Sequence, residues 1–76
     1  GRIIQAKLEL GRALIVRAEK QFDQTVVKEA IGHLAQAVEG LRGDPTIQRA
    51  QSASDALFKA QAMIESRKRF ALNFGS

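Results

Sequence analysis

The chain has 76 residues and a net charge of +4; 45% of its residues are hydrophobic, 26% are charged and none is cysteine. This length suits one domain and not two, and the absence of cysteine excludes disulfides, thiolate nucleophiles and cysteine-based zinc sites. No apolar run approaches the roughly 20 residues of a membrane-spanning helix, and we expect a cytoplasmic location.

The two ends and the charge distribution bear on how the chain is organised. The sequence begins with Gly1 instead of an initiator methionine and ends with Gly75 and Ser76. We therefore expect a fragment of a longer protein that forms one helical domain over residues 1–76. An acidic middle segment, 21–44, lies between two basic segments. This order favours antiparallel neighbours in a bundle, although exposed charge pairs contribute little free energy.

The spacing of apolar residues predicts a first helix over residues 3–20. Gly11 lies near the middle of its apolar face. Because a glycine inside a helix costs up to ~1 kcal/mol relative to alanine, we expect Gly11 to let another helix approach closely. Lys7 also points into this face, and we expect its ammonium group to reach past the end of the bundle. The apolar face comprises Ile3, Ile4, Leu8, Leu10, Leu14, Ile15 and Ala18.

A second helix is predicted over residues 24–41. Asp23 or Thr25 supplies a side-chain oxygen that caps its start. Gly40 and Gly43 are suited to its end, where a left-handed residue often follows the last turn. The apolar face comprises Val26, Val27, Ala30, Ile31, Leu34, Ala37, Val38 and Leu41.

A third helix is predicted to begin after the cap residue Asp44, with Pro45 at the first helical position, and to continue to about residue 72. Its main apolar face is mostly alanine, which packs closely but buries little area per residue. A second, smaller stripe predicts a second partner, either another molecule or the rest of the parent protein. The main face comprises Ala50, Ala53, Leu57, Ala60, Ile64 and Ala71, and the second stripe comprises Ile47, Phe58, Ala62 and Leu72.

Short connections join the three predicted helices, and helices joined in this way are antiparallel neighbours. No segment shows the alternating apolar pattern of a strand, and the chain has no tryptophan or tyrosine. We therefore predict an all-α fold, an antiparallel three-helix bundle. A fragment of a helical-repeat protein is the structural alternative.

The only histidine, His33, lies at the edge of the second apolar face. Its helical neighbours are Glu29 and Gln36, which give at most a weak contact within the helix. A general base needs a nucleophile or an acid within reach, and a metal site needs more ligands than one imidazole and one carboxylate. We expect a histidine at the boundary of the core, and no catalytic residue, cofactor site or metal site.

The basic run of the chain is "ESRKRF", residues 65–70. Arg67, Lys68 and Arg69 are candidates for contact with phosphates, either of nucleic acid or of an anionic membrane. The alternative is a favourable placement of cations in the last turns of a helix. We favour the alternative, because three charges are few and no aromatic stacking platform accompanies them.

Residues 14–41, "LIVRAEKQFDQTVVKEAIGHLAQAVEGL", resemble the first two helices of microtubule-interacting and trafficking (MIT) domains. Ala30 and Ala37 fall at matching positions, and the later stretch "ALFKAQAMIESRK" is similar to the third helix of the family. Leu34 stands where the family usually has an aromatic residue, and Gln61 stands where an acid often meets an arginine of the ligand. The same stretch is also similar to a tetratricopeptide repeat, although that match needs an insertion between the helices.

The MIT resemblance implies a three-helix bundle that binds a helical segment of a partner protein in the groove between the second and third helices. It also implies the residues that contact this segment. These are Leu57, Phe58, Gln61 and Ile64 on one wall, and Gly32 and Gln36 on the other.

We accordingly expect a non-catalytic protein–protein interaction module whose ligand is a helical peptide or a partner helix. One alternative is a structural or oligomerising helical bundle, or a helical-repeat fragment, which a concentration-dependent mass would reveal. The second alternative is a basic helical domain that binds nucleic acid or anionic membrane, for which a steep loss of affinity with salt is the signature.

Overall fold

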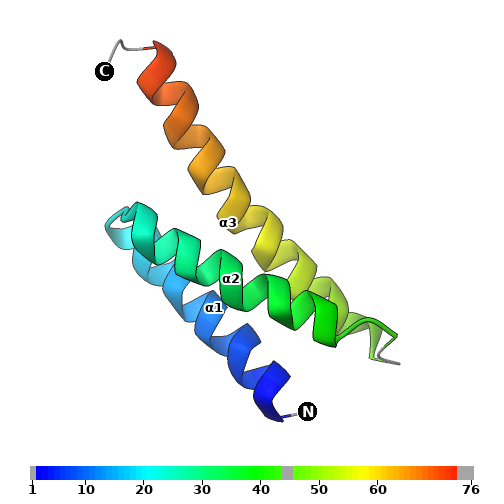
Figure 1. Cartoon of the computed structure of the whole chain (residues 1–76). Helices are drawn as coiled ribbons and strands as arrows, with labels where there is room; N and C mark the ends of the chain where they lie inside the picture. Colours follow the sequence, from blue (N-terminus) through cyan, green and yellow to red (C-terminus); the bar gives the residue numbers. More distant parts are fainter. Residues whose placement is uncertain (1, 44–45, 74–76) are drawn as a thin grey trace.

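A computed structural model describes residues 2–43 and 46–73 of the chain. These residues form three helices, α1 over Arg2–Lys20, α2 over Gln24–Gly40 and α3 over Ile47–Asn73, and no strand occurs among them. Consecutive helices run in opposite directions, and α2 packs against both α1 and α3 (Figure 1). The prediction of an all-α three-helix bundle is therefore confirmed.

The helices α1 and α2 form a hairpin and approach each other closely at Gly11. A β-carbon added to Gly11 would lie 2.5 Å from Cγ of Leu34, a side chain with no exposed surface. Carbon atoms in favourable contact lie about 3.5–4.0 Å apart, so a glycine is needed where α2 comes this close. The close approach predicted at Gly11 is confirmed. Around it, α1 buries Leu8, Ile15 and Ala18.

Three expectations for α1 are wrong. Ile3 is 72% exposed and Leu10 is 47% exposed, although both belong to the predicted apolar face. With about 3.6 residues per turn, both side chains lie at one edge of the apolar arc, and neither joins the core that α1 forms with its neighbours. Lys7 does not reach past the end of the bundle, because its ammonium group donates a hydrogen bond to Oε1 of Gln36 on α2.

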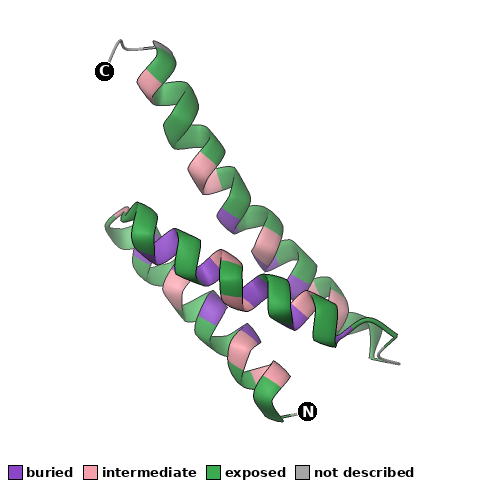
Figure 2. Ribbon diagram, in the orientation of Figure 1, coloured by how far each residue is buried: buried purple, intermediate pink, exposed green. Residues whose placement is uncertain are grey.

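All eight apolar residues predicted for the second helix are buried or half-buried (Figure 2). Of the two predicted caps, Asp23 is the one that caps α2: its carboxylate accepts a hydrogen bond from the Thr25 N–H at 2.9 Å. Beyond the other end of α2, Gly43 has a φ of 76°. This left-handed conformation favours glycine, which has no β-carbon to clash with the following carbonyl.

Replacing Asp23 by alanine is expected to lower the free energy of unfolding by about 0.5–2 kcal/mol, because the Thr25 N–H loses its acceptor and α2 loses a negative charge at its N-terminus. Urea denaturation followed by circular dichroism measures this loss. The matched control is Asp23→Asn, since asparagine caps a helix about as well as aspartate. An alanine variant as stable as the asparagine variant would show that the cap has no effect on stability.

The helix α3 begins at Ile47, two residues beyond the predicted first position. The predicted cap Asp44 and the predicted first helical residue Pro45 lie outside the described residues. Just before the helix, the Thr46 carbonyl accepts a hydrogen bond from the Arg49 N–H at 3.0 Å. From Ile47 the helix is continuous to Asn73.

Small side chains attach α3 to the hairpin, more extensively on α2 than on α1. Ala53, Ala56 and Ala60 are buried, and larger residues beside them are only half-buried. Ala56 is not part of the predicted face and extends it toward α1. On that side the Lys59 ammonium lies 2.8 Å from the Glu19 carboxylate, although an ion pair this exposed contributes little free energy.

The second stripe predicted for α3 is exposed, because all four of its residues face solvent. The C-terminal end of α3 projects beyond the hairpin and away from α1 and α2 (Figure 1). Where α3 passes the α1–α2 connection, the Arg67 guanidinium lies 4.5 Å from the centre of the Phe22 ring. Much of the longest helix is therefore accessible to a partner.

Candidate functional site

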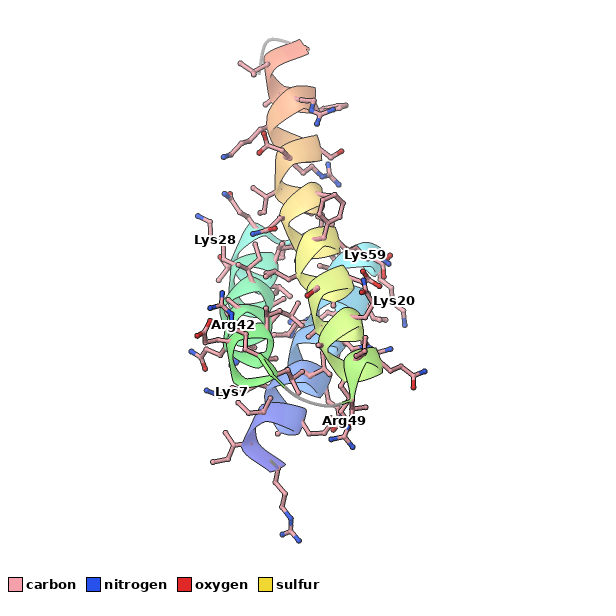
Figure 3. All side chains as sticks on the ribbon, turned by 90° about the vertical axis from the view of Figure 1, so that its right-hand side faces the viewer. Lys7, Lys20, Lys28, Arg42, Arg49 and Lys59 are labelled. Atoms are coloured by element: carbon pink, nitrogen blue, oxygen red, sulfur yellow. The ribbon has the colours of Figure 1, made fainter. Side chains whose placement is uncertain are left out.

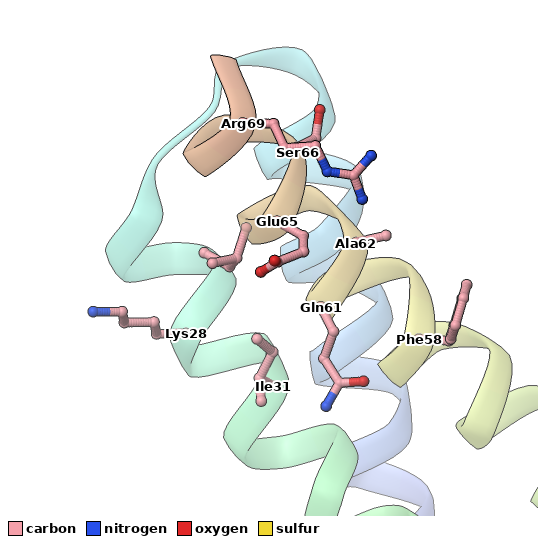
Figure 4. A pocket seen from close by; sticks show the side chains of 9 residues that line it. Lys28, Ile31, Phe58, Gln61, Ala62, Glu65, Ser66 and Arg69 are labelled. Carbon is pink, nitrogen blue, oxygen red and sulfur yellow. The ribbon is translucent and has the colours of Figure 1, made fainter. Parts of the chain in front are cut away.

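A hollow of about 730 Å³ lies between α2 and α3 and extends across the exposed surface of α3. In the part of the hollow nearer α2, half-buried Ile31 of α2 and half-buried Ile64 of α3 form an apolar floor. Lys28 and Glu65 lie at its edges (Figure 4). This part of the hollow is the α2–α3 groove, and its lining residues are Lys28, Ile31, Gln61, Ile64 and Glu65.

The six residues predicted to bind a partner do not all lie at this groove. Gln61 and Ile64 line it, and Leu57 is half-buried and packs against the core. Phe58 is 74% exposed, and its ring lies on the side of α3 that faces away from α2 (Figure 4). Phe58 therefore borders the larger hollow without forming a wall of the groove.

The α2 wall of the groove differs from the predicted one. Gly32 is exposed, and a β-carbon added to it would meet no atom within 4 Å. Gln36 accepts the hydrogen bond from Lys7 on α1, so it lies nearer the α1 side of α2. Lys28 and Ile31 form the wall instead. Apolar spacing identifies the buried arc of α2, but it does not say which edge of that arc faces α1 and which faces α3.

Positive charge exceeds negative charge along the α2–α3 groove and the smaller hollow that continues it. Lys28 and Glu65 lie at its edges, and further along α3 Lys68 lines a smaller hollow of about 220 Å³ together with Phe22 and Ile64. The two hollows adjoin, since Ile64 lines both. A helix that follows the groove into the smaller hollow would pass Lys28, Arg67 and Lys68 and one acidic residue, Glu65, which favours acidic side chains on that helix.

The three cations of the basic run do not share one surface. Consecutive residues of an α-helix project about 100° apart, and the surroundings of the three differ accordingly. Arg67 lies over the Phe22 ring and lines the small hollow near Phe22 together with Lys68, whereas Arg69 lies across α3 from α2 (Figure 4). The three cations therefore do not form one continuous basic face.

A second groove, between α1 and α3, has a volume of about 740 Å³. Buried Ile15 and Ala56 form part of its floor, and the exposed Val16 lies at its edge. Figure 3 shows Lys59 beside this groove, on the opposite side of α3 from Lys28. Sequence reasoning missed this groove, because Val16 and Ala56 lie outside the predicted apolar faces. Its charged residues are of both signs and comprise Arg12, Glu19, Asp55 and Lys59.

Other kinds of site find little support in the described part of the chain. His33 is half-buried on α2, and residues 2–43 and 46–73 hold no group of three or more His, Asp or Glu side chains that is arranged to bind a metal ion. None of the helices within these ranges combines the length and the apolar character needed to cross a lipid bilayer. A scan of protein-family models, a search of curated proteins and a search of solved structures found no match to this chain.

Proposed function

We propose that the chain is a non-catalytic protein–protein interaction module that binds an acidic, amphipathic helix of a partner protein in the α2–α3 groove. The observation that carries this proposal is the apolar floor of Ile31 and Ile64, which lies open between charged edges. Helix-in-groove recognition uses this arrangement, with apolar anchors of the ligand on the floor and charges at the rim. In MIT domains, which residues 14–41 resemble, the ligand helix commonly packs between the second and third helices.

A helix suits this surface better than an extended peptide does. Strand addition requires an exposed sheet edge, and no strand occurs among residues 2–43 and 46–73. The groove runs between two helices, and a third helix packs on such a pair by placing its side-chain ridges between theirs. A ligand with apolar residues at i, i+3 or i+4, and i+7 would place successive anchors along the floor.

Phosphate binding has less support than helix binding. A nucleic-acid or membrane surface is recognised by several cations on one face, whereas Arg69 lies across α3 from α2 and does not line the small hollow that Arg67 and Lys68 share. Arg67 also lies over the Phe22 ring, and Glu65 places a negative charge one turn before Arg69. A cytoplasmic location stays a prediction that accompanies the proposed function.

Selection from a displayed library of helical peptides is the direct test. We expect the enriched peptides to carry apolar residues at helical spacing with Asp or Glu beside them, and to bind in the micromolar range, about −8 kcal/mol. Lys28→Glu should weaken their binding by about three- to tenfold, because it reverses the charge at the rim. Fluorescence anisotropy of labelled peptides measures both affinities.

Two controls make this test specific to the groove. Arg12→Glu makes the same change of charge beside the α1–α3 groove, and we expect it to leave peptide affinity unchanged. Gly32→Ala lies on α2 but away from the groove, and it should also be neutral for binding. Enriched peptides that are basic, or that lose affinity with Arg12→Glu and not with Lys28→Glu, would move the site away from the α2–α3 groove. A library that yields no binder would argue against the module altogether.

A further inference from the structure

The side of α3 opposite its buried alanine face carries a second kind of surface, which borders the α1–α3 groove at Asp55 and the hollow beside α2 at Phe58. We define the outer face of α3 as Asp55, Phe58, Ala62, Ser66 and Arg69, all of which are exposed. We propose that two copies of the chain associate through this face, with their α3 helices antiparallel and crossing at Ala62. This proposal goes beyond the peptide-binding function and uses a different side of α3.

The shape of the outer face suits a copy of itself. Phe58 is 74% exposed and borders the same hollow as the small side chains of Ala62 and Ser66. In an antiparallel pair that crosses at Ala62, a residue before Ala62 in one copy meets a residue at the same distance after Ala62 in the other. Each Phe58 ring therefore lies against Ala62 and Ser66 of the second copy. The small residue at the crossing also lets the two helix axes approach closely.

The charges of the outer face select the antiparallel arrangement. Asp55 and Arg69 lie seven residues before and seven residues after Ala62, which is about two turns or 10.5 Å in each direction. Seven residues bring a helix back to nearly the same side, so both charges lie close to the line through Ala62. An antiparallel pair places Asp55 opposite Arg69 twice, whereas a parallel pair would place like charges together.

This self-complementary order is the reason to name a second copy as the occupant. When a charged face binds itself about a two-fold axis, each charge is stabilised by an opposite charge at the same distance on the other side of the axis. Asp55 and Arg69 meet this condition about Ala62, and Phe58 and Ser66 place a large side chain opposite a small one. A surface that binds an unrelated helix has no need of this symmetry.

Sedimentation equilibrium of the chain over micromolar to millimolar concentrations tests the association. We expect the mass to rise from 8.3 kDa toward twice that value, and Phe58→Asp to remain a monomer. Circular dichroism of Phe58→Asp should match that of the native chain, because Phe58 is outside the core. A native chain that stays monomeric at millimolar concentration overturns the proposal.

Charge exchange tests the pairing itself. Asp55→Arg and Arg69→Asp should each weaken self-association by about tenfold or more, since each introduces two like-charge pairs per dimer. The double variant Asp55→Arg, Arg69→Asp restores opposite charges in the antiparallel pair, and its self-association should return toward the native level. If the single variants associate as well as the native chain, or if the double variant is as weak as the singles, the charge argument is wrong.

Cysteine cross-linking reports the direction of the two helices, and the native chain has no cysteine to interfere. Ala62→Cys should form a disulfide-linked dimer on mild oxidation, because both copies place residue 62 at the crossing. Gln51→Cys should not, because the two cysteines of an antiparallel pair would be about 33 Å apart along the axis and a disulfide needs Cα atoms within about 7 Å. Efficient cross-linking of Gln51→Cys would indicate a parallel pair and overturn the proposal. None of these outcomes bears on peptide binding, which Lys28→Glu tests separately.

Discussion

Leu34→Ala is expected to lower the free energy of unfolding by about 2–5 kcal/mol, which is the range for truncating a large buried aliphatic side chain. Leu34 has no exposed surface and packs against Gly11, where α1 lies close to α2. Because the backbones are already close together there, the hairpin has little freedom to collapse into the space that the side chain leaves. For a chain of this length the total stability is on the order of 4–11 kcal/mol, so this variant loses a large share of it.

Urea denaturation followed by circular dichroism measures this change, and Leu72→Ala supplies the matched control. Leu72 is 84% exposed, and its truncation should change the free energy of unfolding by less than about 0.5 kcal/mol. The comparison holds the chemical change constant and varies only the burial. Equal effects of the two substitutions would mean that Leu34 is not a core residue of the folded chain.

Gly11→Ala is the second substitution with a large expected effect. We expect it to lower the free energy of unfolding, although helix propensity alone predicts an increase. Alanine in place of a glycine within a helix normally stabilises it by up to ~1 kcal/mol. Here the new β-carbon would overlap Leu34, whose Cγ lies 2.5 Å from its position. Overpacking of this kind typically costs about 1–3 kcal/mol, and a net loss of stability is expected.

Gly32→Ala is the matched control for Gly11→Ala, because its new β-carbon would meet no atom within 4 Å. We expect Gly32→Ala to raise the free energy of unfolding by about 0.5–1 kcal/mol. In a Leu34→Ala background the methyl group of Gly11→Ala would occupy vacated space, so the two substitutions should couple favourably in a double-mutant cycle. A Gly11→Ala variant as stable as Gly32→Ala would show that the helices do not approach closely at this point.

The sequence is sufficient to predict those features of the fold that depend on periodicity within one helix. The second helix is the clearest case, because its eight apolar residues form a single arc and all of them are buried or half-buried. Gly11 could also be interpreted correctly, since a glycine in the middle of an apolar face has few uses other than close packing. In the first helix the apolar residues cover a wider arc, and their pattern does not say that Ile3 and Leu10 remain outside.

The binding surfaces depend on how helices are arranged about one another, and single-helix patterns do not contain that information. Choosing Ile31 rather than Gly32 as a wall of the α2–α3 groove requires knowing on which side of the hairpin α3 packs. The same knowledge is needed to find the α1–α3 groove. In contrast, the exposure of Phe58 could be predicted, because it lies on a separate stripe from the alanine face of α3.

The alanine face of α3 also affects how the molecule opens. Alanine buries little apolar area, so Ala53, Ala56 and Ala60 retain α3 with less free energy than larger side chains would. Elements held by few apolar contacts separate from a folded protein at a lower cost than global unfolding. Both proposed partners bind to α3, and a ligand that binds only the folded state shifts the equilibrium toward it. Each partner would therefore strengthen the attachment of the helix that it recognises, and the bound protein would be more stable than the free one.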